Sequence, residues 1–267
     1  MTGSQPRLTA SVSVGGREFA VRNIGAGPAT VILVAGYGQS MSQAWSSVHQ
    51  RLGESVRTCA YDRLGVGDSD PPSGTRTFVE LAEELDGVIT ALGVARPIVL
   101  VAHSMGAPVA MTWAAQRPAD VSAVVLLDGS GPAFHEAIGV AVANALGDGS
   151  EDPDVMAVKA FLDDFEDPQT NIERVDVVAS YAALDPFPRI GTVPLVVMHG
   201  TVTEFPSVME PERLHAVWLA GQRAWASMSE RGRIVEVEGA GHQIALERPD
   251  VVVQTVLSLI QSADAAV

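Results

Sequence analysis

Short hydrophobic runs recur along this chain and alternate with longer amphipathic stretches. The hydrophobic runs cover residues 30–35, 56–60, 97–102, 121–127, 193–199 and 233–237. Short runs with few polar interruptions are typical of strands in a parallel sheet that is buried on both faces. The amphipathic stretches repeat apolar residues at three- and four-residue spacing, which predicts helices over 43–53, 77–92, 105–117, 211–228 and 246–262.

This alternation of strand and helix predicts an α/β fold. The sheet should be mostly parallel, with right-handed crossovers and helices on both faces. Before the first hydrophobic run, residues 8–14 and 17–23 each alternate between apolar and polar positions around Gly15 and Gly16. A glycine pair between two alternating segments predicts an N-terminal antiparallel β-hairpin.

One connection is too long for a plain loop. Roughly 65 residues separate the run ending near Leu127 from the run starting near Val193, so this stretch should carry structure of its own. Helical patterns over 137–146 and 155–165 predict a helical lid at residues 131–190, inserted into a core made of 1–130 and 191–267. Its many acidic residues are interpreted as a solvated helix face rather than a metal site.

Composition narrows the class of partner. The 267 residues carry a net charge of −15, which repels phosphate backbones and anionic lipids, so no nucleic-acid or membrane partner is expected. The single cysteine, Cys59, follows a strand pattern and is expected to be a buried thiol. No secretory leader or transmembrane run is recognised, so a soluble, cytoplasmic protein is expected. The oligomeric state is left open, and a homodimer is allowed.

The sequence AHSMG at 102–106 follows the hydrophobic run that ends at Ala102. A serine at a strand-to-helix corner with small residues two positions away on each side fits a nucleophile elbow, G-x-S-x-G, which lifts the hydroxyl clear of the sheet. Ala102 replaces the first glycine of that pattern, a modest departure. The alternative interpretation is a serine that only caps a helix.

A serine hydroxyl needs a base to accept its proton, and an acid to orient that base. His242 is the candidate base, because it follows the last hydrophobic run in the glycine-containing loop 239–242. The other five histidines are interpreted as structural. Asp128 and Glu204 each follow a strand at the same edge of the sheet and are both candidates for the acid. Asp128 stands immediately at its strand end, whereas Glu204 has a longer reach from a looser loop.

The turn AGYG at 35–38 follows the first long hydrophobic run and should lie at this same edge. The backbone N–H groups of Tyr37 and Met105 are the candidates for stabilising an oxyanion, with Gly36 beside the substrate. A glycine-rich turn can also bind phosphate, but a dinucleotide fingerprint and a P-loop lysine are both missing here. No cofactor and no metal are therefore expected.

Together these segments resemble the α/β-hydrolase superfamily, in particular its small bacterial members with a lid. The resemblance spans nearly the whole chain and is carried, in order, by VILVAGYG (31–38) with Trp45, AYDRLGVGDS (60–69), AHSMG (102–106) and Gly241-His242 with Glu247-Arg248-Pro249. It implies an α/β-hydrolase fold. The family usually places its acid in a G-x-x-D pattern, where this chain has Gly200 and Thr203. Some members take the acid from the preceding strand end, where Asp128 stands, so the resemblance favours Asp128 over Glu204.

The function expected is that of a serine hydrolase acting on a small carboxylic ester or lactone, with Ser104, His242 and Asp128 as the triad. Phe134, Phe161, Phe165 and Phe187 in the insertion suggest an apolar substrate, or else a lid core. A thioesterase, a carbon–carbon bond hydrolase or a haloperoxidase-like enzyme would use the same residues, and a non-catalytic small-molecule receptor is the competing class. Epoxide hydrolases and haloalkane dehalogenases carry aspartate at the serine position and are disfavoured.

Overall fold

The structure is a computed structural model that describes residues 10–184, 187–202 and 208–264. Those residues form an eight-stranded sheet with the order β1-β2-β4-β3-β5-β6-β7-β8. The predicted α/β fold with a mostly parallel sheet is confirmed. So is the N-terminal hairpin: β1 (Ala10–Val14) pairs antiparallel with β2 (Arg17–Ile24), which pairs antiparallel with β4 (Arg57–Tyr61).

The five remaining pairings in the sheet are all parallel. They join β4 to β3 (Thr30–Val34), β5 (Ile98–His103), β6 (Val121–Leu127), β7 (Leu195–Gly200) and β8 (Gly232–Val237) in the sheet order given above. Strands β3, β5 and β7 are buried at every position, as continuous hydrophobic runs require. The carboxyl ends of all these strands therefore meet at one edge of the sheet.

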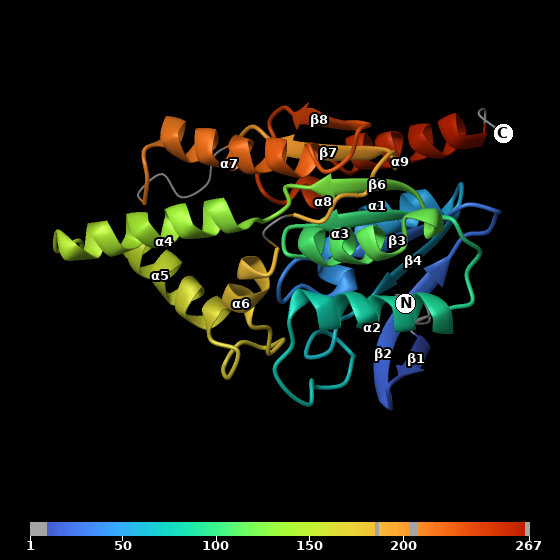
Figure 1. Ribbon diagram of the computed structural model, residues 1–267, viewed down its shortest axis with the longest axis horizontal. Helices are drawn as coiled ribbons and strands as arrows, with labels where there is room; N and C mark the ends of the chain where they lie inside the picture. Colours follow the sequence, from blue (N-terminus) through green and yellow to red (C-terminus); the bar gives the residue numbers. More distant parts are fainter. Residues whose placement is uncertain (1–9, 185–186, 203–207, 265–267) are drawn as a thin grey trace, which may run out of the picture.

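Alternate side chains of each strand feed two hydrophobic layers. Val31 and Leu33 belong to the layer covered by α1 (Met41–Gly53), α8 (Ile244–Glu247) and α9 (Pro249–Asp264). Ile32 and Val34 point the other way, into the layer covered by α2 (Phe78–Ala91) and α3 (Gly106–Gln116). Helix α7 (Pro211–Ala226) packs along β7 and β8 (Figure 1).

The long connection between β6 and β7 is helical, with α4 (Pro132–Gly147), α5 (Pro153–Glu166) and α6 (Val177–Ala182). The first two helices extend the predicted ranges because Pro132 and Pro153 each occupy a first turn, where proline suits a helix. Figure 1 shows this insertion extending from one end of the sheet (green to yellow). We call α4 and α5 the outer helical pair. They share a small hydrophobic cluster of their own with residues from the start of α7.

A second part of the insertion is packed into the main body. We call residues 171–177 the root of the insertion. Asn171, Glu173, Val175 and Val177 are all at most 1% exposed, and Val175 forms a parallel bridge with Arg76. The Asn171 side chain binds both the N–H and the carbonyl of Val175, at 2.9 and 2.8 Å. The root is therefore fixed to the sheet domain more firmly than the outer helical pair.

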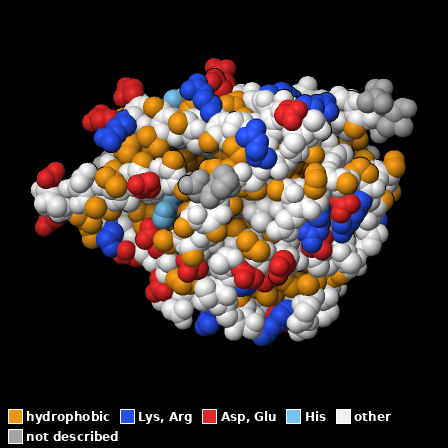
Figure 2. Space-filling view, in the orientation of Figure 1, with side chains coloured by type: hydrophobic (Ala, Val, Ile, Leu, Met, Phe, Trp, Pro, Cys, Tyr) orange, Lys and Arg blue, Asp and Glu red, His pale blue; other side chains and the backbone are white. Residues whose placement is uncertain are grey.

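The structure corrects the sequence prediction in two places. The single helix predicted over 246–262 is broken at Pro249 into α8 and α9, because proline has no N–H to continue the helical hydrogen bonds. Helix α6 and a short 3-10 turn at Pro118–Asp120 were not predicted. On the face in Figure 2, hydrophobic side chains lie between Asp and Glu on the projecting insertion; Val140, Met156 and Phe161 are each about half exposed. Within the described ranges, no helix is long and apolar enough to cross a membrane.

Candidate active site

Ser104 occupies the sharp corner between β5 and α3. Its φ of 50° is in the left-handed region, which a non-glycine residue adopts only at a local cost. The corner is possible because Gly106 lies against β3: a Cβ there would come within 2.7 Å of the Ala35 and Val34 carbonyl oxygens. The predicted strand–serine–helix arrangement is present, and the Ser104 side chain lines a cavity at the carboxyl edge of the sheet.

Asp128 also has a positive φ, 47°, and stands at the end of β6 with 4% of its surface exposed. Its Oδ2 lies 3.1 Å from Nδ1 of His242. Its Oδ1 accepts hydrogen bonds from Trp218 Nε1 at 2.8 Å and from the Gly200 N–H at 3.3 Å. Oδ1 also lies 3.5 Å from Nδ1 of His199. The carboxylate is thus surrounded by N–H groups from three other elements.

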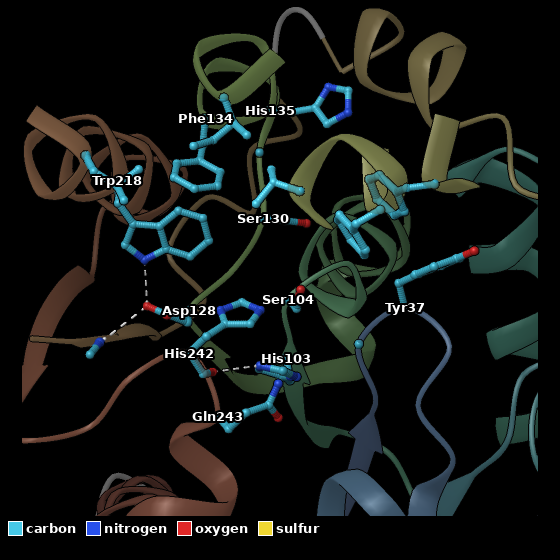
Figure 3. A pocket seen from close by; sticks show the side chains of 18 of the residues that line it. Tyr37, His103, Ser104, Asp128, Ser130, Phe134, His135, Trp218, His242 and Gln243 are labelled. Carbon is cyan, nitrogen blue, oxygen red and sulfur yellow. Dashed lines mark hydrogen bonds and ion pairs between the residues drawn. The ribbon is translucent and has the colours of Figure 1, made fainter. Parts of the chain in front are cut away.

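These contacts set the charge of Asp128. Burial opposes ionisation, but the contacts with His199, His242 and Trp218 outweigh it and lower the pKa of Asp128 below its usual value. A carboxylate that faces Nδ1 holds a neutral imidazole with its hydrogen on Nδ1. Figure 3 shows the His242 ring between Asp128 and Ser104. The arrangement is that of an acid, a base and a hydroxyl in sequence.

His103, next to the serine, holds the loop that carries His242. Burial, and the repulsion that a protonated His242 would exert, lower the pKa of His103 to about 3, so its ring is neutral and carries one N–H. Because the His242 carbonyl can only accept, Nε2 donates to it at 2.9 Å. Nδ1 is then an acceptor, 3.0 Å from the side-chain amide of Gln39, which favours the amide orientation that turns its NH₂ toward His103. Gln39 pairs in turn with Gln243 at 3.1 Å.

The turn after β3 supplies the candidate oxyanion donors. Within the described chain, neither the Tyr37 N–H nor the Met105 N–H has a protein acceptor. Gly36 is tightly enclosed, since a Cβ there would lie 2.9 Å from His103 Nδ1 and 3.2 Å from Ser104 Cβ. Two backbone donors without partners, beside a hydroxyl that lines the cavity, can stabilise a negative oxygen that forms there.

The cavity has a volume of about 660 Å³. Its polar floor is the sheet edge, and its walls are side chains of the insertion and of α7. Three of the four predicted phenylalanines line it: Phe134, Phe161 and Phe165. Phe187 is not among the lining residues and instead packs against Trp225, with ring centroids 4.5 Å apart.

Several residues of this cavity were not singled out from the sequence. Trp218 of α7 holds Asp128 and packs against Phe134 at 4.1 Å. Ser130 accepts a hydrogen bond from the buried Tyr181 hydroxyl at 3.0 Å. His199, interpreted as a core residue, is indeed 1% exposed, but its ring also borders the cavity beside Asp128. A histidine that ends a strand at the edge bearing the other candidates was the available signal.

Glu204, the alternative acid, lies outside the described residues. Of the remaining histidines, His49 is buried under the sheet and binds the Thr58 carbonyl at 3.1 Å, as a structural residue should. His135 and His215 line the cavity. Among the described residues, no three His, Cys, Asp or Glu side chains are grouped as ligands for a metal ion.

Comparison with known proteins supports the fold and extends to the family. Residues 31–255 match the model of the alpha/beta hydrolase family. An uncharacterized protein, YqjL of Bacillus subtilis (strain 168), is 33% identical over 104 residues, which are 39% of this chain and 41% of that protein. The chain thus spans less than half the length of that curated relative.

Two solved structures share the architecture at lower identity. A thermophilic esterase from Thermogutta terrifontis superposes with a TM-score of 0.65 at 21% identity, covering 96% of this chain and 98% of the esterase. A meta-cleavage product hydrolase from Pseudomonas fluorescens IP01 superposes with a TM-score of 0.66 at 19% identity, covering 96% and 98%. At this identity the likeness concerns the fold, whereas the family match covers most of the chain. The chain belongs to the alpha/beta hydrolase family.

Proposed function

We propose that this protein is a serine hydrolase that cleaves a carboxylic ester or lactone through an acyl-enzyme. The observation that carries the proposal is the 3.1 Å contact between Asp128 Oδ2 and His242 Nδ1, with the His242 ring beside a serine held at a positive φ (Figure 3). A purely structural role for His242 does not explain why a buried, ionised carboxylate faces its Nδ1.

In the proposed reaction, His242 takes the proton from the Ser104 hydroxyl as its oxygen attacks the substrate carbonyl. The Tyr37 and Met105 N–H groups stabilise the tetrahedral oxyanion. His242 then protonates the leaving alcohol, and the acyl group remains on Ser104. Water, deprotonated by His242, releases the acid in the second half of the reaction. Asp128 stays ionised throughout and orients the imidazole.

The substrate proposed is apolar and of moderate size. A cavity of about 660 Å³ suits a small molecule, and three phenylalanines from the insertion form much of its wall. In the proposal, the insertion at 131–190 acts as the lid over this cavity. The structurally similar Thermogutta terrifontis protein is an esterase, which favours ester substrates here. The similar meta-cleavage product hydrolase makes a carbon–carbon bond the second candidate.

The first experiment is intact-mass analysis after treatment with a fluorophosphonate. We expect one adduct on the wild type, none on Ser104→Ala, and one on Ser227→Ala, a matched serine substitution at an exposed position at the end of α7. A panel of p-nitrophenyl esters of increasing chain length, a thioester and a vinylogous diketone that is cleaved at a carbon–carbon bond then shows which kind of bond the enzyme hydrolyses. A folded wild type with neither an adduct nor turnover would contradict the proposal and favour a small-molecule receptor.

A further inference from the structure

A buried arginine binds the turn that carries the candidate oxyanion donor. Arg63, which follows β4, is 3% exposed. Its Nη1 donates to the Ala35 carbonyl and its Nη2 to the Gly36 carbonyl, both at 2.6 Å. Burying a cation is costly unless it is paired, so a buried arginine aimed at two backbone carbonyls needs a reason beyond packing.

Its partner comes from the insertion, 110 residues away in sequence. Glu173, in the root, is fully buried and accepts hydrogen bonds from Nε and Nη2 of Arg63 at 2.6 and 2.8 Å. The same carboxylate accepts the Gly38 N–H at 2.7 Å. The ion pair therefore binds the turn at three backbone groups: two carbonyls before Tyr37 and one N–H after it.

The geometry of the peptide bond gives this contact a consequence. The Gly36 carbonyl and the Tyr37 N–H belong to one planar, trans peptide unit, so their oxygen and hydrogen point in opposite directions. A guanidinium that fixes the Gly36 oxygen thereby fixes the direction of the Tyr37 N–H. The following peptide unit is fixed in the same way, because Glu173 holds its N–H at Gly38.

The turn is held only weakly by its own hydrogen bonds. Gly36 is enclosed by His103 and Ser104 so closely that no side chain fits there. Its carbonyl receives only a long backbone hydrogen bond, 3.4 Å, from the Gln39 N–H. Because Glu173 neutralises Arg63, the pair can hold the turn without placing a net charge beside the reacting oxygen.

We infer that Arg63 and Glu173 are positioning residues that aim the Tyr37 N–H at the oxyanion, and that the insertion therefore completes the catalytic machinery as well as the cavity wall. The inference rests on the proposed function, because it assigns the Tyr37 N–H the role of an oxyanion donor. Neither side chain lines the cavity, so both act through the backbone of the turn.

The kinetic test uses Glu173→Gln, which keeps the shape and removes the charge, and Arg63→Lys, which keeps the charge and removes the fork. Loss of one oxyanion donor lowers kcat by roughly 10²–10³-fold in serine hydrolases. We expect a partly misaligned donor to lower kcat by about 10- to 100-fold with KM within about threefold. Affinity for a trifluoromethyl ketone, which forms the tetrahedral oxyanion, should fall by the same factor as kcat/KM.

The matched control is Asp86→Asn. Asp86 is a partly buried carboxylate that contacts Arg96 and Arg117, before β5 and after α3, at the opposite edge of the sheet. It should lose stability without losing kcat. If Asp86→Asn lowers kcat as much as Glu173→Gln does, or if the Glu173 loss lies in KM alone, the effect is general destabilisation and the inference is wrong.

A second readout does not require activity. Amide hydrogen exchange in a peptide covering residues 36–39 should be faster in Glu173→Gln and Arg63→Lys than in the wild type and Asp86→Asn, under conditions where all four are folded. Unchanged exchange would overturn the inference even if activity fell. If the wild type fails to react with the fluorophosphonate, the proposed function is wrong. Amide exchange in the two variants, whether faster or unchanged, then still shows whether the ion pair holds the turn.

Discussion

The sheet edge and the insertion contribute to the cavity in different ways. The edge supplies the polar groups, each placed at the end of a strand and held by hydrogen bonds of 2.8–3.3 Å around Asp128. The outer helical pair supplies apolar walls and packs around a small hydrophobic cluster of its own. Substitutions at the edge should therefore change turnover, while substitutions in the outer pair should change which substrate is accepted.

The root of the insertion breaks this simple division. It belongs to the insertion by sequence, yet alternate residues of it are buried, and it reaches the turn after β3 through Glu173. One inserted segment thus contains a part that packs around a cluster of its own and a part that is fixed to the main body.

The largest effect is expected at the edge. Asp128→Asn removes the charge that stabilises the imidazolium and favours the wrong tautomer of His242, so kcat should fall by about 10⁴-fold with little change in KM. Steady-state hydrolysis of an ester identified by the panel measures it. The contrasting carboxylate is Asp164, in α5 of the outer pair, which accepts a hydrogen bond from the Tyr37 hydroxyl. Asp164→Asn should affect kcat far less. Near-normal kcat in Asp128→Asn would mean that another residue is the triad acid, and Glu204 is the next candidate.

A substitution in the root should lower the free energy of unfolding. Asn171→Ala leaves the N–H and carbonyl of Val175 without their buried partners, so the free energy of unfolding should drop by about 1–3 kcal/mol. The matched substitution in the outer pair is Asn144→Ala, which is exposed on α4 and should stay within about 0.5 kcal/mol of the wild type. Urea denaturation measures both. Equal losses would mean that the root and the outer pair are one unit.

Two buried histidines, His49 and His103, should make the protein sensitive to acid. Burial lowers the pKa of His49 to about 4 and that of His103 to about 3, so the folded chain leaves both rings neutral where the unfolded chain protonates them. Stability should accordingly fall as the pH drops below 6.5, by up to about 1.4 kcal/mol per pH unit for each such ring. The contribution is complete above pH 6.5 and is lost on the way down to the folded pKa.

The test compares His49→Gln with wild type between pH 6.5 and 4.5. The variant should show a shallower slope, by about one proton. Burial also raises the pKa values of buried Asp62 and partly buried Glu84, which act in the opposite sense, and the difference between variant and wild type removes their contribution. His135 of the insertion is less buried, and its pKa is lowered by burial against the raising effect of Glu166, so His135→Gln should change the slope less. A larger change in His135→Gln would contradict the comparison.

The smallest effect is expected in the wall. Phe161 is 53% exposed, lines the cavity and stacks on Phe165 at 5.4 Å. Phe161→Ala should shift the preferred acyl length and change KM by about three- to tenfold, because it removes part of one apolar contact, while kcat for short esters stays near the wild-type value. Met156→Ala, exposed on the same helix but not lining the cavity, should leave the preference unchanged. A fall in kcat for short esters would show that the outer pair also aligns the reacting groups.

The sequence predicted what depends on local pattern. Continuous hydrophobic runs located the strands, and a serine between a strand and a helix located the corner at Ser104, because both signals lie within a few neighbouring residues. Pro249 could also have predicted the break between α8 and α9, but the apolar spacing continues on both sides of it and indicated a single helix.

Contacts between distant segments could not be predicted in this way. Arg63 and Glu173 are 110 residues apart, and neither belongs to a periodic pattern that points to the other. Trp218 reads as one more apolar position on an amphipathic helix, and only the fold brings its N–H to Asp128. Polar groups that hold the site residues in place thus depend on how whole helices and strands pack together, which patterns in a single sequence do not reveal.

The position of Asp128 leaves another segment free to diverge. In the proposed triad the acid stands at the end of β6, and β7 contributes the N–H of its last residue, Gly200, and the His199 ring to it. Val202, the next part of the stretch after β7 to border the cavity, is half exposed. In the proposed enzyme, a change of side chain at Val202 can therefore alter the cavity, and with it the substrate, without altering Ser104, Asp128 or His242.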